Sequence, residues 1–175
     1  MKIRRALLLD SEQIAQVHVN CWKTSYRNIV PDEFLDKKLS WERSKKNWEN
    51  TLNNFPDSIF LVAEDDCGKI VGFCAGGKNR DMAKNPQFIG ELMGIYILEK
   101  YQKKGLGTQL VEKFVNELQI MNIQNMIIWA LKKSKYKKFY EKLGGHYVDE
   151  KNIEIGGKKL NVVAYGFEKL KNLSP

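Results

Sequence analysis

A glycine-rich turn is the part of the sequence best suited to chemistry. The octapeptide YQKKGLGT stands directly before an amphipathic segment. A helix that begins at such a turn presents unpaired backbone N–H groups and the positive end of its dipole, which together bind phosphate. Gly105 and Gly107 would let an anion approach the backbone closely. Lys103 and Lys104 add positive charge, and Thr108 adds a hydroxyl. The turn therefore predicts a phosphate site, unless its glycines only serve helix packing.

Two common phosphate-binding patterns do not fit this turn. A dinucleotide-binding turn needs a third glycine and an acidic residue about 20 positions later. Leu110 occupies the glycine position here, and Gln124 and Asn125 stand where the acid is required. A Walker loop is excluded because no Gly-Lys-Ser/Thr follows. The remaining pattern is a pyrophosphate cradle of the form Q-x-x-G-x-G, which starts at Gln102.

The length and composition indicate one globular domain, and the net positive charge favours an anionic partner. The 175 residues carry a formal net charge of +8, with 43% hydrophobic and 29% charged residues. A basic protein of this kind attracts nucleic acid, lipid headgroups or a phosphorylated small molecule. No apolar run approaches the ~18 residues of a membrane span. The apolar stretch at Ala6–Leu9 is also too short for a secretory signal.

Cysteine and histidine usage predicts neither a metal site nor a disulfide framework. The three cysteines, Cys21, Cys67 and Cys74, form no C-x-x-C pair, and only His18 and His146 accompany them. An odd number of unpatterned cysteines is typical of the reducing cytoplasm, which is the expected location.

The hydrophobic pattern around the turn predicts strands and helices in alternation. A strand over 88–98 leads into the turn, a helix over 105–121 follows, and then come a strand over 126–131 and a helix over 133–143. The buried face of the first of these helices is expected at i, i+3 and i+4 spacing: Leu106, Leu110, Val111, Phe114, Val115 and Leu118.

The flanking regions complete a mixed α/β sheet. A strand over 2–5 precedes a mostly helical region that extends to residue 55. In this region we expect helices that begin at Asp10, with Gln13 completing a capping box, at Pro31, with Phe34 and Leu35 inward, and at Ser40. Strands over 58–64 and 69–75 form a hairpin, and strands at 147–148 and over 160–167, joined by a Gly156-Gly157 turn, close the sheet.

Taken in order, these pieces resemble the GNAT superfamily of N-acetyltransferases. The segments ELMGIYILEKYQKKGLGTQL, NMIIWAL and KKFYEKLGG match the family's strand, Q-x-x-G-x-G turn and helix, next strand, and tyrosine-bearing helix. The match is specific over 89–147 and rests on element order elsewhere. The resemblance implies one domain over 1–175, with residues 88–147 binding acetyl-CoA and residues 1–55 forming the helical acceptor side. It also implies a mixed sheet whose two central strands splay apart.

The resemblance further implies which residues hold acetyl-CoA. The pantetheine arm would lie in the splay against the backbone of Ile95, Tyr96 and Ile97, near a bulge marked by Gly94. The pyrophosphate would sit on the turn formed by Gln102, Lys103, Lys104, Gly105, Leu106, Gly107 and Thr108. Many family members place an asparagine about seven residues before the helix tyrosine, where this chain has Lys133 followed by Ser134. Ser134 is the expected substitute and helix cap, and Lys137 is one of several lysines expected near the cofactor.

Two residues are candidates for proton transfer. Tyr140 matches the tyrosine that acts as general acid toward the departing thiolate, because a phenol of pKa ~10 keeps its proton at neutral pH. Glu91 stands in an otherwise apolar strand, eleven residues before Gln102, where lysine acetyltransferases of the family have a base. A structural pairing of Glu91 is the competing interpretation.

The predicted activity is transfer of an acetyl group from acetyl-CoA to a primary amine, by direct attack in a ternary complex. Trp22 and Tyr26 are the candidate acceptor contacts on one helical face, although a packing role is equally open. The acceptor is a small-molecule or peptide amine, with bacterial polyamine acetyltransferases as the most similar members, and a second copy of the chain is a further candidate partner. No metal, specific nucleic acid or membrane is expected. The alternative functions are a non-catalytic acyl-CoA-binding or regulatory module and, without a supporting motif, a nucleic-acid-binding protein.

Overall fold

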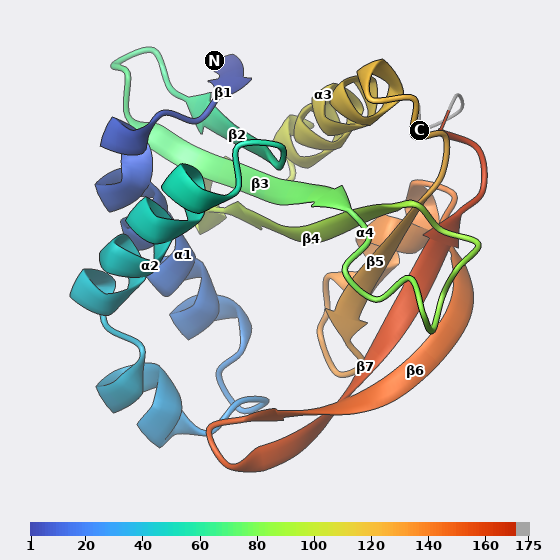
Figure 1. The fold of residues 1–175 in the computed structure, drawn as a ribbon. Helices are drawn as coiled ribbons and strands as arrows, with labels where there is room; N and C mark the ends of the chain where they lie inside the picture. The colour runs from blue at the N-terminus through green and yellow to red at the C-terminus, as the bar shows by residue number, and fades with distance from the viewer. Residues whose placement is uncertain (171–175) are drawn as a thin grey trace.

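The computed structural model describes residues 1–170 and arranges them around one twisted seven-stranded sheet in the order β1-β2-β3-β4-β5-β7-β6 (Figure 1). All neighbouring strands are antiparallel except β4 and β5, which are parallel. The strands are Lys2–Arg5 (β1), Ile59–Glu64 (β2), Ile70–Lys78 (β3), Gly90–Ile97 (β4), Met126–Leu131 (β5), His146–Ile155 (β6) and Lys158–Phe167 (β7). The predicted mixed α/β class is confirmed.

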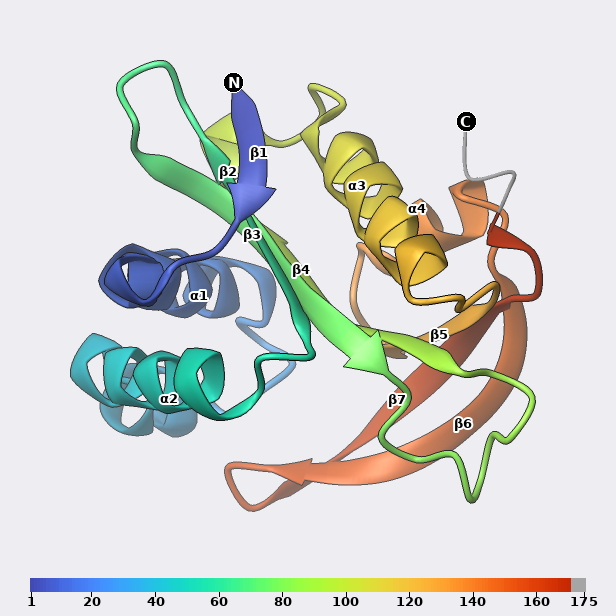
Figure 2. The same cartoon turned by 45° about the horizontal axis from the view of Figure 1, so that its top comes forward.

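Helices cover both faces of this sheet. The four α-helices are Ser11–Ser25 (α1), Trp41–Asn54 (α2), Leu106–Ile120 (α3) and Lys137–Lys142 (α4). Figure 2 shows α1 and α2 on one side of the sheet and α3 and α4 on the other. Within residues 1–170, no helix combines the length and the apolar character that a membrane crossing requires.

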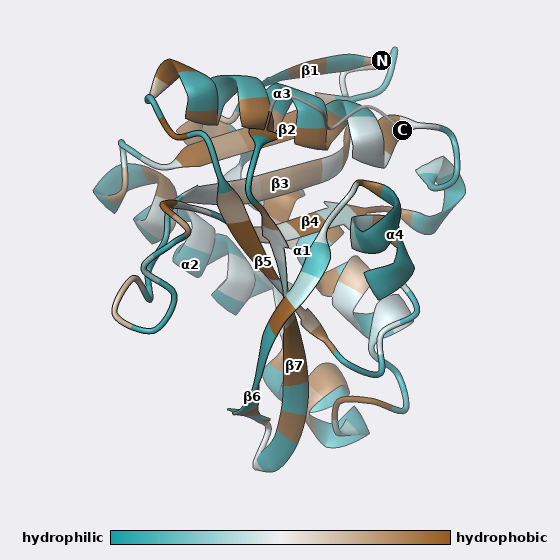
Figure 3. Ribbon diagram, turned by 90° about the vertical axis from the view of Figure 1, so that its right-hand side faces the viewer, coloured by the Kyte–Doolittle hydropathy of each residue, from teal (hydrophilic) through white to brown (hydrophobic). Residues whose placement is uncertain are grey.

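The largest core lies between α3 and the sheet. All six residues predicted for the buried stripe of α3 are buried. They pack on inward-facing residues of β2, β3 and β5, such as Leu61, Cys74 and Met126. Figure 3 shows this apolar layer in brown, in contrast with the teal, lysine-rich α4. A smaller core on the opposite face joins α1 to Phe73 and its neighbours. The central strands are therefore held from both faces.

Two helix starts differ from the predictions. Asp10 does not cap α1 with its side chain, because its carboxylate binds Arg4 and accepts the backbone N–H of Leu7 at 2.7 Å. Gln13, predicted to complete a capping box, instead accepts the backbone N–H of Ile70 on β3 at 3.0 Å. Partners on β1, before the helix and on β3 thus replace the predicted cap. By contrast, Ser40 caps α2 as predicted and accepts the N–H of Arg43 at 3.2 Å.

Other differences concern the length of elements. The helix predicted at Pro31 is reduced to a short π-helical turn, Phe34–Lys38, that buries Leu35. α4 is shorter than predicted and begins at Lys137. The strand predicted at 147–148 extends over all of β6, which forms a long hairpin with β7 around Gly156 and Gly157. This hairpin reaches across to the segment after α1, seen at the bottom of Figure 1.

Candidate active site

The two central strands of the sheet diverge after a short pairing. β4 and β5 are paired over only three residues each, Gly90–Leu92 opposite Met126–Ile128. Beyond Leu92, β4 stays paired with β3 as far as Ile97, but no strand within residues 1–170 pairs with its other edge. Residues Met93–Ile97 are consequently half-exposed in the middle of the sheet. The predicted splay is present, and strand backbone forms an edge of the gap.

Strand register determines which peptide groups of β4 face this gap. Leu98 donates its N–H to the carbonyl of Val71 on β3 at 2.9 Å. Because peptide groups alternate in direction along a strand, those of Tyr96 also face β3, while those of Ile95 and Ile97 face the gap. The arrangement fits the predicted pantetheine contact at Ile95, whereas the carbonyl of Ile97 already accepts the side-chain N–H of Gln102 at 2.7 Å. The arrangement does not fit a backbone contact at Tyr96, whose peptide groups are used by the sheet.

A β-bulge lies where the splay begins. Ala75 of β3 is opposite Gly94, but the next residue, Gly76, is opposite Leu92. Met93 is therefore the extra residue on β4, directly before Gly94, as predicted from a glycine inside an apolar strand. A bulge reorients the local peptide groups and bends the strand, which marks the point where β4 leaves β5.

The glycine-rich turn presents free backbone donors at the start of α3. Among the described residues, the backbone N–H groups of Lys103 through Thr108 have no hydrogen-bond acceptor outside the turn. Lys103 and Gly105 both adopt left-handed backbone conformations, with φ of 58° and 80°. Alternation of this kind makes successive N–H groups converge into an anion-binding concavity. The turn therefore has the donor arrangement that a pyrophosphate needs.

Gln102 differs from the rest of the predicted cradle. Its backbone N–H is already used by the carbonyl of Glu99 at 3.1 Å. Its side chain donates to the carbonyl of Ile97 at 2.7 Å and accepts from the Tyr136 hydroxyl at 3.2 Å. Gln102 thus connects β4 to the segment before α4 through its side chain, and the predicted contact through its amide does not fit this conformation.

Tyr140 lies on α4 against the central core. Its ring is 9% exposed and packs edge-on against Phe139 at 5.5 Å and tilted against Tyr165 at 6.0 Å. Burial, and secondarily the nearby Tyr96, raises the pKa of Tyr140 well above its usual value. Its hydroxyl has no hydrogen-bond partner within residues 1–170. Tyr140 is thus a buried, neutral phenol whose hydroxyl has no hydrogen-bond partner in the described part of the chain.

Glu91 is held in a structural ion pair. Its side chain is 4% exposed, and Arg80 binds both carboxylate oxygens, with Nη2 to Oε1 at 2.6 Å and Nε to Oε2 at 3.0 Å. The backbone N–H of Arg80 adds a third hydrogen bond at 3.1 Å. Glu91 also lies at the end of β4 that is paired with β5. A carboxylate with three donors, outside the splay, is poorly placed to take a proton, so this geometry favours the structural interpretation.

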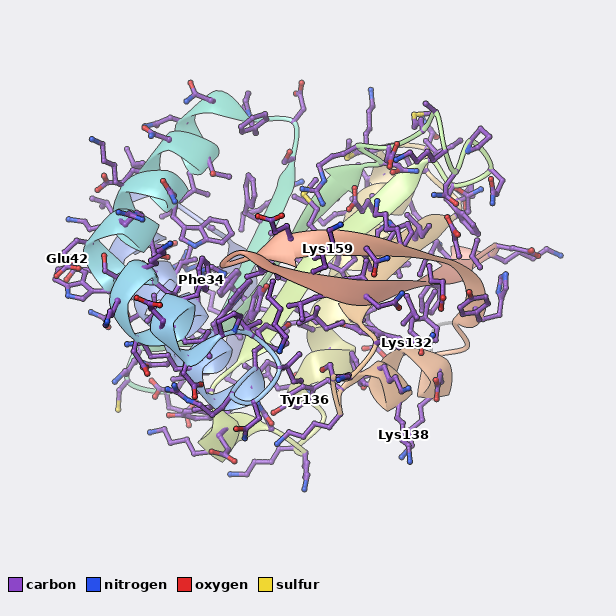
Figure 4. The ribbon with its side chains drawn as sticks, turned by 90° about the horizontal axis from the view of Figure 1, so that it is seen from below. Phe34, Glu42, Lys132, Tyr136, Lys138 and Lys159 are labelled. Carbon is purple, nitrogen blue, oxygen red and sulfur yellow. The ribbon has the colours of Figure 1, made fainter. Side chains whose placement is uncertain are left out.

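The segment between β5 and α4 supplies a buried serine and several lysines. Ser134 is 5% exposed, and its hydroxyl accepts the N–H of Tyr136 at 3.3 Å. The predicted cap is thus displaced, because the residue before α4 is Tyr136 and not Ser134. Lys137 is half-buried at the start of α4, whereas Lys138 is exposed and points away from the body of the protein in Figure 4.

Aromatic residues gather at the end of α1. Trp22 of α1 and Tyr26, the residue after α1, are in edge-to-face contact at 5.0 Å, and Trp22 is 6.2 Å from Phe34. Figure 4 shows Phe34 beside the tip of the β6–β7 hairpin, where a Cβ added to Gly156 would lie 2.7 Å from the Phe34 Cβ. Trp22 also donates its indole N–H to the Tyr96 hydroxyl at 3.2 Å. Trp22 therefore contacts β4, and Tyr26 packs with Trp22 in an aromatic cluster.

Comparison with known proteins identifies the family. The family model described as an acetyltransferase (GNAT) domain matches residues 56–144, which is just over half of the chain. The chain belongs to the GNAT family. It is an N-acetyltransferase, and the alternative of a non-catalytic binding module has no support from these relatives.

Full-length relatives agree with this assignment. The uncharacterized N-acetyltransferase YuaI of Bacillus subtilis is 32% identical over 171 residues, covering 98% of this chain and 95% of that protein. An uncharacterized N-acetyltransferase of Archaeoglobus fulgidus is 28% identical over 130 residues, covering 74% and 82%.

Solved structures share the GNAT fold at low identity. The structure of yncA from Salmonella typhimurium, determined with acetyl-CoA, superposes with a TM-score of 0.71 at 17% identity and covers 100% of this chain and 96% of that one. The PaiA N-acetyltransferase of Thermoplasma acidophilum, determined with coenzyme A, gives a TM-score of 0.69 at 20% identity, covering 95% and 98%.

The sequence did not reveal three side chains that shape this site. Arg80, which binds Glu91, lies in a segment without a periodic pattern. Tyr136 lies among lysines that carry no distinctive pattern, and Tyr96 is predicted from the sequence only as a backbone contact. A tyrosine two residues after a strand glycine is the signal that the sequence offers for Tyr96, because side chains at i and i+2 share a face.

Proposed function

We propose that this chain transfers the acetyl group of acetyl-CoA to a primary amine by direct attack, without a covalent acetyl-enzyme. The observation that carries the proposal is the joint presence of an unpaired β4 edge and a run of free amides at the start of α3. The first suits an extended amide-containing arm, and the second suits a diphosphate. Their succession along one strand and turn matches the order of groups in coenzyme A.

The donor set fits this co-substrate. Ile95 presents an N–H and a carbonyl to the gap, and the turn from Lys103 to Thr108 presents N–H groups. Acetyl-CoA supplies an activated thioester, whose C–S bond breaks as the new N–C bond forms. The buried cysteines do not favour a relay, because burial raises the pKa of Cys21 to about 12 and raises that of Cys74 further.

Tyr140 is the proposed general acid. Its phenol stays protonated at neutral pH, and its hydroxyl is not used within residues 1–170. Burial also strengthens a thiolate as a base, since a low-dielectric site disfavours every anion. The proton that Tyr140 gives to sulfur is restored by the proton that the amine nitrogen loses, so the overall transfer is balanced.

The amine does not need a carboxylate base in this arrangement. An alkylammonium has a pKa of ~10.4 in water, and burial among apolar groups lowers it. The aromatic side chains of Trp22, Tyr26 and Phe34 provide such surroundings next to β4. We therefore assign deprotonation to release through water as the amine enters the site, and not to Glu91.

A matched pair of glycine variants tests the cradle. Gly105 and Gly68 have almost the same positive φ, 80° and 77°, and a Cβ at either position meets no atom closer than 3.8 Å. Alanine strains both turns alike, by about 1 kcal/mol. In calorimetry with acetyl-CoA, Gly105→Ala should weaken binding about tenfold or more, whereas Gly68→Ala, in the β2–β3 turn, should bind like the wild type. Wild-type protein that binds no CoA thioester would refute the proposal.

An acceptor panel tests the reaction itself. Wild-type protein, acetyl-CoA and diverse primary amines should release free thiol in proportion to acetylated amine. Absence of turnover with every class of amine, despite measurable acetyl-CoA binding, would contradict the proposed transfer.

A further inference from the structure

The side chain of Tyr96 is fixed at the start of the splay. Its hydroxyl accepts the indole N–H of Trp22 at 3.2 Å. The His18 ring meets it edge-on at 5.0 Å, and the Phe73 ring lies 5.1 Å away at a tilt of 32°. Rings from α1 and β3 therefore confine this phenol to one orientation.

That orientation places the phenol over the β-bulge. A Cβ added to Gly94 would lie 2.8 Å from Cε2 of Tyr96 and 3.3 Å from its hydroxyl oxygen. Gly94 is thus required here because the Tyr96 ring occupies the space of a side chain. The hydroxyl consequently lies beside the point where β4 leaves β5, on the face covered by α1.

The hydrogen bonds of Tyr96 are incomplete. A phenol has one donor and two acceptor positions, and Trp22 uses one acceptor position. Within residues 1–170 the hydroxyl has no other partner. Burial raises the pKa of Tyr96, so it remains a neutral phenol and not a phenolate base. One acceptor position and its own proton remain for a ligand.

We propose that the Tyr96 hydroxyl binds the attacking amine and directs its lone pair toward the acetyl group; this inference rests on the proposed function above. A neutral primary amine has two N–H groups and one lone pair, so donation of one N–H to Tyr96 leaves the lone pair free to attack. Trp22 acts through Tyr96 and is a positioning residue.

The surroundings of Tyr96 indicate the class of acceptor. The aromatic surface continues from Trp22 to Tyr26 and Phe34. In the part of the chain that the structure describes, no carboxylate is hydrogen-bonded to Trp22, Tyr26 or Tyr96. A primary amine on an uncharged carbon body suits this surface. A polyamine would bring further ammonium groups, and none of the side chains that contact Tyr96, namely Trp22, His18 and Phe73, is a carboxylate.

The test uses Tyr96→Phe, which keeps the ring and removes only the hydroxyl. The probes are 2-phenylethylamine and spermidine at saturating acetyl-CoA. We expect Tyr96→Phe to lower kcat/KM for 2-phenylethylamine about 10- to 100-fold, while the KM for acetyl-CoA stays unchanged. Trp22→Phe should lower kcat/KM in the same direction by a smaller factor. Tyr147→Phe, which removes an exposed hydroxyl from β6, is the matched control.

The outcomes separate this inference from the proposed function. Wild-type protein should acetylate 2-phenylethylamine with a higher kcat/KM than spermidine. If Tyr96→Phe retains wild-type kcat/KM, if spermidine is preferred, or if 2-phenylethylamine is not acetylated, the inference is overturned while acetyl-CoA binding still supports the proposed function. Wild-type protein that binds no acetyl-CoA overturns both.

Discussion

The two halves of β4 have opposite roles although they are contiguous in sequence. The first half, Gly90–Leu92, is paired on both edges and buried, and its one charged side chain is held by Arg80. The second half, Gly94–Ile97, is paired on one edge and half-exposed. The bulged residue Met93 separates the two halves. The first half is held by both β3 and β5, whereas the second half is held by β3 alone and has free peptide groups on its other edge. One strand can therefore be fixed in the sheet at one end and offer backbone hydrogen bonds to a ligand at the other.

Removal of the Tyr140 hydroxyl should give the largest effect on catalysis beside the second half of β4. Tyr140→Phe loses the proposed acid, so kcat should fall about 100-fold or more, while the affinity for acetyl-CoA and the melting temperature stay near wild type. Steady-state kinetics and calorimetry measure these quantities. An unchanged kcat would remove Tyr140 from the mechanism.

Protonation of His18 should loosen the aromatic cluster that holds Tyr96. Burial lowers the pKa of His18 to about 4, whereas the unfolded chain has the ordinary value near 6.5. Between pH 6.5 and 4 the unfolded state therefore binds a proton that the native state does not, so stability falls as the pH falls. At pH 5 the loss is about 2 kcal/mol.

Urea titrations across this pH range measure the effect, with His18→Phe as the reference. The variant should lack this component of the pH dependence. Identical pH dependence in the two proteins would show that His18 titrates normally.

Neutralisation of Glu91 should lower the stability of the first half of β4 and leave the acetyl transfer unchanged. Glu91→Gln keeps the shape but loses the charge that Arg80 binds. Because the Arg80 side chain is 63% exposed, the expected loss in the free energy of unfolding is only about 1 kcal/mol. The kcat/KM and its pH profile should remain near wild type. A drop in kcat of ~30-fold or more, with an altered pH profile, would restore Glu91 as the base.

Lysines around α4 should give the smallest effect. Lys137→Ala should weaken acetyl-CoA binding by about threefold at low salt and by less at high salt, because surface charges are screened. Lys138→Ala, on the exposed side of the same helix, is the control. Equal effects of the two variants would indicate general attraction and no contact at Lys137.

Much of the fold could be predicted because the local sequence patterns favour the same helices and strands that pack in the tertiary structure. The stripe of α3, the bounds of β5 and the cap at Ser40 are local in origin, since each depends on residues within a few positions. Asp10 and Gln13 do not form a capping box because Arg4 on β1 binds the carboxylate of Asp10 and the N–H of Ile70 on β3 binds the side chain of Gln13. A local motif cannot reveal such competitors.

The candidate site divides in the same way. The sequence by itself determined the glycine-rich turn before α3 and the bulge beside Gly94, since glycine allows backbone conformations and close approaches that other residues do not. Only the tertiary structure decided that Glu91 pairs with Arg80, and that Tyr96 turns its side chain over the bulge. These outcomes depend on which side chains meet across the sheet. The separation of two residues along the chain does not determine the distance between their side chains in the folded protein.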